Sequence, residues 1–288
     1  MLGSVGWLSW KVNRMLATER EQSRSPFTEK LIRPPGESLR LQIEGLREEI
    51  SEVGLRGILY LIGPSVLLMV LRLESKAIYF VIVGITFAIG WALAWREWQR
   101  LRKLRVDLRN ARLGFDGERF VAAELNGLLT QGYRVFHDFV VDWMLDDRTH
   151  NIDHIIVGPA GVFALETKAW RKPIGPAQPQ KLQVTAEGIQ KPGDIPRMDA
   201  IEQAKRNAAT LSKWLTGNAP ETVPVRPLVV VPGWYVVADD WRTCGVQTLS
   251  GLAGRLPGLT RSAGLSPREV QQLGDRIEAH CRTANVAN

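Results

Sequence analysis

Two long apolar stretches are the first pattern along the chain. Residues 57–71 carry no charged side chain, and residues 77–95 form a second uncharged run of nineteen residues. The second run is long enough to cross the hydrocarbon core of a bilayer, and the first reaches that length once a few flanking residues are included. The pattern predicts a transmembrane hairpin within residues 53–95, with spans at about 55–73 and 77–95. Two buried helices of a soluble core remain an alternative, because a Gly-Pro pair interrupts the first run.

The region before the hairpin, residues 1–52, has a weaker helical pattern. The pattern begins after the helix-breaking sequence Pro34-Pro35-Gly36 and predicts a short amphipathic helix. Its apolar positions are Leu39, Ile43, Leu46 and Ile50. This helix either leads into the first span as a solvated helix or packs against a partner helix or the membrane. Residues 2–10 are apolar, but the first basic residue follows them, which is the wrong order for a signal peptide.

The distribution of basic residues predicts the orientation of the hairpin. Residues 96–112 contain seven lysines and arginines against two acids, whereas the connecting sequence RLESK contains two basic residues. The positive-inside rule therefore places the basic juxtamembrane segment 96–111 and all that follows in the cytoplasm. Because the hairpin returns, the N-terminal region is cytoplasmic too. We expect a multi-pass protein of the cell membrane with both termini in the cytoplasm.

Along residues 112–288, segments with helical and strand periodicity alternate, which is typical of a soluble α/β domain. The expected order is helix, three strands, helix, strand, with a β-hairpin inserted after the third strand and a helical extension at the C-terminus. The first helix should end at Gly132. The expected elements are helix 117–129, strands 133–141, 151–157 and 162–168, a hairpin within 181–191, helix 198–215, strand 223–232 and helix 266–280.

Two acids within the second and third strands point to chemistry. If the turn between these strands has two residues, Asp153 faces Glu166, and like charges that face each other across a sheet are destabilising. Lys168 lies on the same face of its strand as Glu166 because side chains alternate. Two carboxylates with open positions for water suit Mg²⁺ or Mn²⁺, and a lysine beside them can stabilise charge on a phosphate. A salt-bridge cluster of the same three side chains is the alternative.

A third acid lies on the preceding helix. Glu118 precedes Val121 and Leu125 of the apolar stripe by three and seven residues, so it projects from the buried face of the helix. An unpaired buried carboxylate is costly, and a metal or a basic partner would explain it. Alternatively, Glu118 lies in the first turn of the helix and complements the helix dipole.

The overall composition limits the ligands that a metal site in this chain could use. The chain has 288 residues, a formal net charge of +7 and two cysteines, Cys244 and Cys281, with no CxxC pair. Its four histidines lack the spacing of a histidine-built metal centre, so oxygen atoms should hold any metal. The basic charge is no evidence for nucleic-acid binding, because residues 96–112 supply a net five of it.

Together these motifs resemble the nuclease-related domain, or NERD, family of the PD-(D/E)XK nuclease superfamily over about residues 112–235. The resemblance is carried by Gly117-Glu118, Ile152-Asp153-His154, Gly161-Val162-Phe163 and Glu166-Thr167-Lys168. It implies a restriction-endonuclease-like αβββαβ core with a mixed sheet. It also implies that Asp153 and Glu166 bind Mg²⁺ or Mn²⁺, that Lys168 assists the attacking water, and that Glu118 supports the site.

The resemblance also extends to possible substrate contacts. The sequence EQAKRNAATLSKWL resembles a conserved helix of the family whose face, with Gln203 and Asn207, approaches the active site or the nucleic-acid backbone; a polar flank beside an apolar stripe is the alternative. Arg171 and Lys172 follow the proposed site and would hold phosphates, or else form a solvated basic turn. The insertion RKPIGPAQPQ is a substrate-contacting loop or a connector.

These expectations combine into a membrane-anchored, cytoplasm-facing nuclease-like protein that hydrolyses nucleic-acid phosphodiester bonds with Mg²⁺. The expected partners are nucleic acid, with DNA favoured, the lipid bilayer, and a second copy of the chain bound through the hairpin or the N-terminal helix. The alternative is a non-catalytic nucleic-acid-binding, scaffold or sensor domain at the membrane that retains the nuclease fold.

Overall fold

A computed structural model of the chain describes seven segments of it. They are residues 32–70, 76–141, 150–172, 181–217, 219–238, 245–259 and 264–284. The expectations for residues 2–10, for the loop around residues 72–75 and for most of the insertion at 171–180 lie outside these segments.

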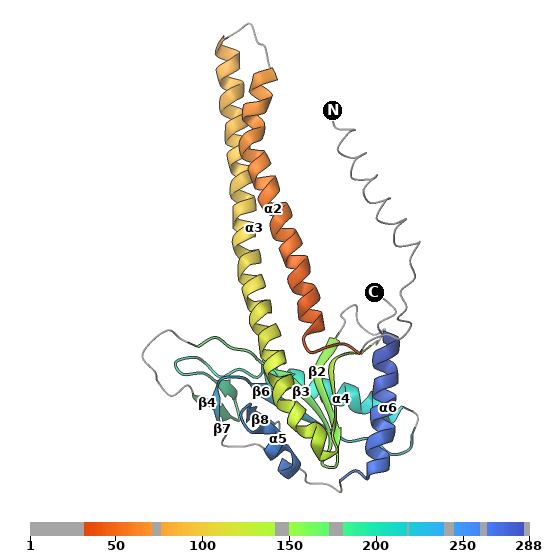
Figure 1. Cartoon of the computed structure of the whole chain (residues 1–288). Helices are drawn as coiled ribbons and strands as arrows, with labels where there is room; N and C mark the ends of the chain where they lie inside the picture. The colour runs from red at the N-terminus through yellow and green to blue at the C-terminus, as the bar shows by residue number, and fades with distance from the viewer. Residues whose placement is uncertain are drawn as a thin grey trace, which may run out of the picture.

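Two long helices stand side by side and project from a compact α/β domain (Figure 1). Helix α2 spans Glu37–Val70, and helix α3 spans Lys76–Leu125 with 50 residues. The expected amphipathic helix and first span are therefore one helix. The expected second span, basic segment and domain helix are also one helix, because no proline interrupts residues 76–125. The separate helix predicted for residues 117–129 was wrong in this respect.

Pro64 lies inside α2 without ending it. A proline in a helix frees the carbonyl four residues earlier, which here belongs to Tyr60. Gly90 of α3 meets that turn so closely that an added Cβ would lie 2.5 Å from Tyr60 O and 2.9 Å from Pro64 Cγ. The Gly-Pro pair is thus accommodated by close packing of the two helices, which small residues at a helix interface permit.

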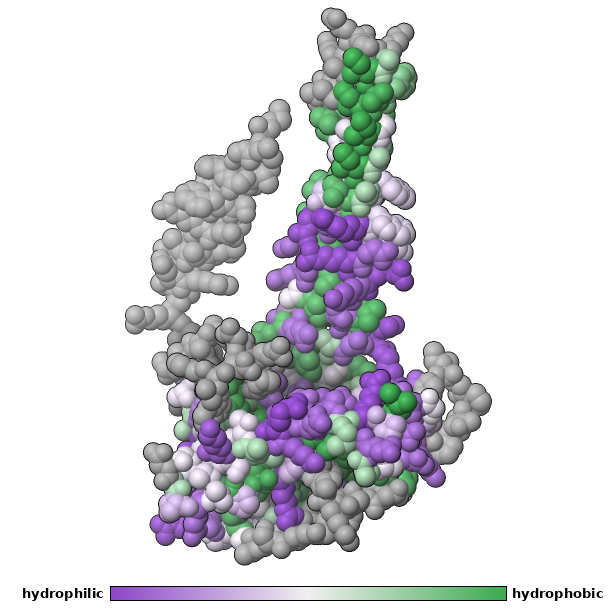
Figure 2. Space-filling view, turned by 180° about the vertical axis from the view of Figure 1, so that it is seen from behind, coloured by the Kyte–Doolittle hydropathy of each residue, from purple (hydrophilic) through white to green (hydrophobic). Residues whose placement is uncertain are grey.

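The outer half of the helix pair is apolar and exposed. Both helices are long and apolar enough to cross a membrane, and 6% of each apolar window is buried. Figure 2 shows this apolar surface around the far end of the pair, with a hydrophilic band between it and the domain. Exposure on this scale contradicts the alternative of two helices buried in a soluble core.

The hydrophilic band is a polar stalk, which we define as residues 37–52 of α2 and 96–112 of α3. The α2 part has five glutamates and two arginines, a net charge of −3, whereas the α3 part has a net charge of +5. Arg100 forms an ion pair with Glu49 across the stalk. Glu97 is buried between the helices, with an oxygen 3.8 Å from Arg56 Nε. The opposite charges favour the antiparallel pairing of the two helices.

A mixed five-stranded sheet forms the centre of the domain, in the order β1-β2-β3-β6-β8. The strands are β1 Arg134–Val141, β2 His150–Gly158, β3 Gly161–Thr167, β6 Val225–Val231 and β8 Gly245–Thr248. Strands β1 to β3 are antiparallel neighbours, and β6 and β8 continue parallel to β3. Val157 pairs with Val162, so the register expected for a two-residue turn is confirmed.

Helices cover both faces of this sheet (Figure 1). Helices α4 (Asp199–Thr216) and α6 (Pro267–Ala284) pack on one face through a core that includes Ile155, Ala164 and Leu211. The end of α3, the 3₁₀ turn η1 and helix α5 pack on the other face. These elements are η1 Asn126–Gln131 and α5 Leu252–Arg255, followed by η2 Leu256–Leu259. Gly132 caps η1 in the left-handed conformation, close to the predicted end of the helix.

A second, three-stranded sheet has the order β5-β4-β7. The expected hairpin within residues 181–191 is confirmed as β4 Lys181–Thr185 and β5 Gly188–Gln190. Strand β7 Tyr235–Ala238 joins it in parallel. Strands β7 and β8 and helix α5 were not expected from the sequence, because they are short and lack a sustained apolar period.

Candidate functional site

Three carboxyl groups and a lysine gather where β3 ends. Asp153 on β2, Glu166 on β3 and Glu118 on α3 are 6%, 2% and 5% exposed. The β2–β3 register brings the first two together, and the backbone N–H of Thr167 donates a 2.7 Å hydrogen bond to Asp153 Oδ2. The tight helix–strand packing needs a glycine at 117, where an added Cβ would lie 2.8 Å from Ala169 Cβ. The three acids come from three separate elements, so the fold assembles the site.

Glu166 is the best-connected of the three acids. Lys168 Nζ lies 2.8 Å from Glu166 Oε1, and Asn207 Nδ2 donates a 3.0 Å hydrogen bond to Glu166 Oε2. Lys168 also donates to Gln203 Oε1 at 2.9 Å. The face of α4 that carries Gln203 and Asn207 therefore lies against the site, and Asn207 is buried. Both side chains thus contact the candidate cluster, and substrate binding by Gln203 or Asn207 stays a prediction.

Burial raises the pKa of all three acids. The pKa of Asp153 is well above its ordinary value, through burial and then through the charges of Glu166 and Glu118. Burial, Asp138 and Glu166 raise the pKa of Glu118 to about 8. Burial also raises the pKa of Glu166, although the charge and hydrogen bond of Lys168 oppose the shift. One lysine therefore does not compensate three carboxylates in this buried space.

Glu118 lies in the interior of α3, more than ten turns from its start at Lys76. The alternative that it complements a helix dipole in the first turn is therefore wrong. Its Oε2 atom is buried and has no hydrogen-bond partner within the described segments. A backbone hydrogen bond from Gly36, which directly precedes α2, opposes this rise in the pKa of Glu118. The buried face that the sequence assigned to Glu118 is confirmed.

The carboxylates of the cluster meet some of the requirements of a divalent-cation site. Within the described segments, no group of three or more histidine, cysteine or acidic side chains is arranged to hold a metal ion. Asp153 and Glu166 offer two carboxylates, although Glu166 already contacts Lys168 and Asn207 and Asp153 already accepts from Thr167. Mg²⁺ is commonly bound by one or two carboxylates with water and phosphate oxygens as further ligands. Glu118 Oε2 has no hydrogen-bond partner within the described segments, and burial raises the pKa of the acids. A bound cation would favour their ionised forms. A hard cation would suit these residues.

The two basic residues predicted to hold phosphates are not drawn into this cluster. Arg171 is exposed and its Nη2 atom donates a 2.9 Å hydrogen bond to the backbone oxygen of Arg109 on α3. Lys172 is also exposed, and its side chain lies beside Gly233 after β6. Phosphate binding by either residue stays a prediction.

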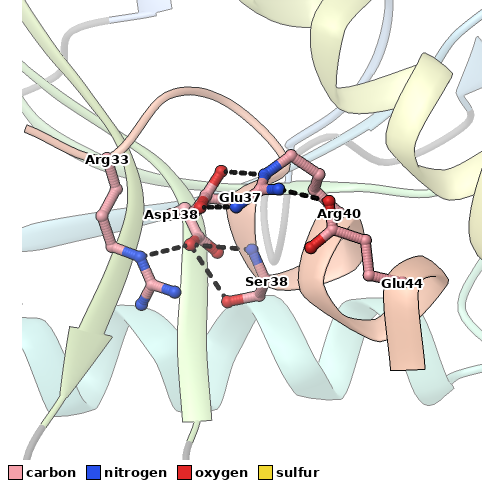
Figure 3. A network of polar contacts seen from close by, with 6 residues as sticks. All are labelled: Arg33, Glu37, Ser38, Arg40, Glu44 and Asp138. Carbon is pink, nitrogen blue, oxygen red and sulfur yellow. Dashed lines mark hydrogen bonds and ion pairs between the residues drawn. The ribbon is translucent and has the colours of Figure 1, made fainter. Parts of the chain in front are cut away.

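Sequence reasoning missed Asp138, an acid in the middle of β1. Its side chain is fully buried, and its backbone has a φ of +48°, a left-handed conformation that aspartate tolerates better than most residues. It accepts a hydrogen bond from Asn151. Figure 3 shows its hydrogen bonds from Ser38 and its ion pair with Arg33. The available signal was an acid within a predicted apolar strand, beside Phe139.

A buried histidine, His154, and a half-buried one, His137, face each other on β2 and β1 beside Asp138. His137 Nδ1 and His154 Nδ1 are 2.8 Å apart, and His154 is completely buried. Burial lowers the pKa of His137 to about 4 and that of His154 well below its ordinary value. Both rings are therefore neutral at physiological pH, and they join β1 to β2 beside the candidate site.

The family model described as NERD, nuclease-related domain, matches residues 113–232. This segment is similar to nuclease-related domains. The NERD family is generally assigned to the PD-(D/E)XK superfamily. The match covers all four residues of the carboxylate and lysine cluster and also the α4 residues that contact them. Comparisons with curated proteins and with solved structures found no match.

Proposed function

We propose that this protein is a metal-dependent nuclease held at a membrane by its helix hairpin. The observation that carries the proposal is the convergence of Glu118, Asp153, Glu166 and Lys168 at one strand end of the NERD domain, with the acids buried and insufficiently compensated. Clusters of perturbed acids beside a basic group are typical of functional sites.

In this proposal Asp153 and Glu166 would hold Mg²⁺ or Mn²⁺, and Glu118 would support them from α3. A cation held by these residues would polarise a phosphate and lower the pKa of a bound water. Lys168, at 2.8 Å from Glu166, is placed to orient the attacking water or to stabilise charge on the scissile phosphate. Asn207 and Gln203 hold Glu166 and Lys168 in place.

The proposed core is the restriction-endonuclease-like αβββαβ arrangement. Its support is the order of elements in the described part of the domain: α3, β1, β2, β3, α4 and β6 follow one another, with η1 after α3 and the β4–β5 hairpin after β3. The parallel pairing of β3 with β6 brings the strand after α4 next to the strand that carries Glu166.

The proposed location is the cell membrane, with the domain and both termini in the cytoplasm. It is supported by the two exposed apolar helices and by the net charge of +5 on the α3 part of the polar stalk. The proposed partners are nucleic acid, with DNA favoured, the bilayer, and a second copy of the chain through the hairpin or the start of α2.

A non-catalytic nucleic-acid-binding or scaffold domain is the second candidate. It is favoured by one observation, that no group of three or more metal-ligating side chains is assembled in the described part of the chain. In that case Lys168 and Glu166 would be a structural ion pair.

The test is a nuclease assay on the full chain in detergent micelles, with labelled single- and double-stranded DNA and RNA, in Mg²⁺, Mn²⁺ or EDTA. We expect cleavage that requires metal and falls about 100-fold or more in Asp153→Asn and Lys168→Ala. Lys205→Ala, an exposed lysine on α4, is the matched control and should cleave normally. Absence of cleavage by a folded wild type, together with no Mn²⁺ binding by calorimetry, would favour the scaffold.

A further inference from the structure

The turn that precedes and opens α2 lies between the helix hairpin and the candidate site. We call residues 33–38 the α2 latch. Although these residues are some 100 positions from β1 in the sequence, Figure 3 shows Arg33 and Ser38 directed at Asp138 from two sides. The side chains of Glu37, Arg40 and Glu44 pair with one another along α2 and do not contact Asp138. The latch therefore has a side that faces the domain and a solvated side.

Asp138 Oδ2 is the anchor of the latch. It lies 3.0 Å from Arg33 Nε and accepts hydrogen bonds from the backbone N–H of Ser38 at 3.1 Å and from its hydroxyl at 3.0 Å. A carboxylate at the first turn of a helix accepts N–H groups that have no partner inside the helix and complements the helix dipole. Asn151 Nδ2 holds the other oxygen of Asp138 at 2.7 Å. Asp138 and Asn151 both belong to the sheet, and the α2 latch binds to Asp138.

The middle of the latch contacts α3 at the candidate site. Gly36 has a φ of +77°, and an added Cβ there would lie 2.6 Å from Phe115 Cδ2. Phe115 is three residues before Glu118, so both side chains lie on the same side of α3. The Gly36 backbone also forms a hydrogen bond to Glu118. The same turn therefore touches a site acid and is held by Asp138.

We propose that the α2 latch docks on Asp138 and thereby holds Glu118 in the candidate site, so that the segment leading into the membrane hairpin is a working part of that site. Asp138 is a positioning residue in this arrangement, and Arg33 and Ser38 are its ligands. The catalytic consequence rests on the proposed nuclease function, whereas the docking itself does not. The site would then be incomplete in a fragment that begins after α2.

The test compares variants of the full chain in detergent micelles. Arg33→Gln/Ser38→Ala removes the latch side of the contact and leaves the domain sequence intact. Arg33→Lys/Ser38→Thr keeps the charge and the hydroxyl and serves as the rescue variant. Arg40→Ala is the matched control, because it breaks only the solvated ion pairs to Glu37 and Glu44.

The first readout is amide hydrogen exchange resolved to residues 36–38. The Ser38 amide has its partner in Asp138, outside its own helix, so its protection reports docking directly. We expect protection in the wild type, Arg40→Ala and the rescue variant. In Arg33→Gln/Ser38→Ala we expect exchange roughly tenfold faster at residues 36–38 and a smaller rise at residues 115–118.

The second readout is cleavage, which we expect to fall in kcat by roughly tenfold with KM unchanged when the latch opens, and to recover in the rescue variant. An unprotected Ser38 amide in the wild type overturns the proposal, and so does unchanged kcat with an open latch. If the wild type does not cleave, the proposed nuclease function is wrong, and the exchange rates of Arg33→Gln/Ser38→Ala alone test the latch. Faster exchange at both residues 36–38 and residues 115–118 supports the latch. Faster exchange confined to residues 36–38 overturns it.

Discussion

Asn207 on α4 donates a 3.0 Å hydrogen bond to Glu166 on β3, inside the protein. The resemblance to NERD domains suggested that this face of α4 approaches the active site or the nucleic-acid backbone. In the structure the amide is buried against a site carboxylate. The hydrogen bond fixes the orientation of Glu166, whose other oxygen faces Lys168 at 2.8 Å. A role in positioning the acid follows directly from this geometry.

Asn207→Ala should therefore lower kcat and leave KM nearly unchanged. A hydrogen bond to a charged group contributes about 1.5–3 kcal/mol, which corresponds to about a 10- to 160-fold loss of kcat. The measurement is steady-state cleavage by the full chain at saturating metal. Gln272→Ala, an exposed amide on α6, is the control and should leave both constants unchanged. A rise in KM at constant kcat would instead assign Asn207 to substrate binding.

The stability of the metal-free protein should fall as the pH rises from about 6.5 to about 8. Glu118 has an ordinary pKa of 4.5 and a folded-state pKa of about 8, so the folded chain binds the extra proton between these values. Its contribution is complete below pH 4.5 and is lost as the pH rises through about 8, with a slope of at most about 1.4 kcal/mol per pH unit. Urea unfolding in EDTA, followed by circular dichroism, measures this slope.

The histidines limit the pH range in which this effect can be read. The folded-state pKa of His137 is about 4, below its ordinary value of 6.5, so its contribution is complete above pH 6.5 and is lost as the pH falls towards about 4. The two trends oppose each other below pH 6.5. Above it, Glu118→Gln should flatten the slope, and Glu202→Gln, an exposed acid on α4, should not. An identical slope in Glu118→Gln would refute the assignment.

Two glycines at the start of α2 should respond to alanine in opposite ways. Gly36 has a positive φ and lies against Phe115, so Gly36→Ala should destabilise the full chain by about 1–3 kcal/mol. Gly45 is inside the helix with nothing within 4 Å of an added Cβ, so Gly45→Ala should stabilise the helix by about 0.5–1 kcal/mol. Thermal unfolding in micelles compares the two. Equal effects would contradict the packing of the latch on α3.

The orientation can be tested by cysteine labelling in intact cells. In a background without Cys244 and Cys281, we expect a membrane-impermeant maleimide to label Glu74→Cys in the short sequence between the helices. Gln272→Cys on the exposed face of α6 should be labelled only after lysis. Labelling of Gln272→Cys in intact cells would place the domain outside.

Local patterns anticipated much of the domain. The β2–β3 register followed from a two-residue turn between apolar strands, and it brought Asp153 next to the end of β3 as expected. The burial of Glu118 followed from its place in an apolar stripe. The boundaries of the long helices did not follow, because charge and apolar runs divide a chain into segments even where the backbone continues as one helix.

By itself, the sequence determined the length of the two apolar helical runs and the apolar pattern of the central strands. It also determined the presence of three acids on buried faces. These properties depend on residues a few positions apart, so periodicity reveals them. The tertiary structure decided which distant groups meet those acids: Asn207 at Glu166, and Ser38 at Asp138 across 100 positions. Such contacts arise when packed elements enclose polar groups that must find partners, and no local spacing encodes which partner lies opposite.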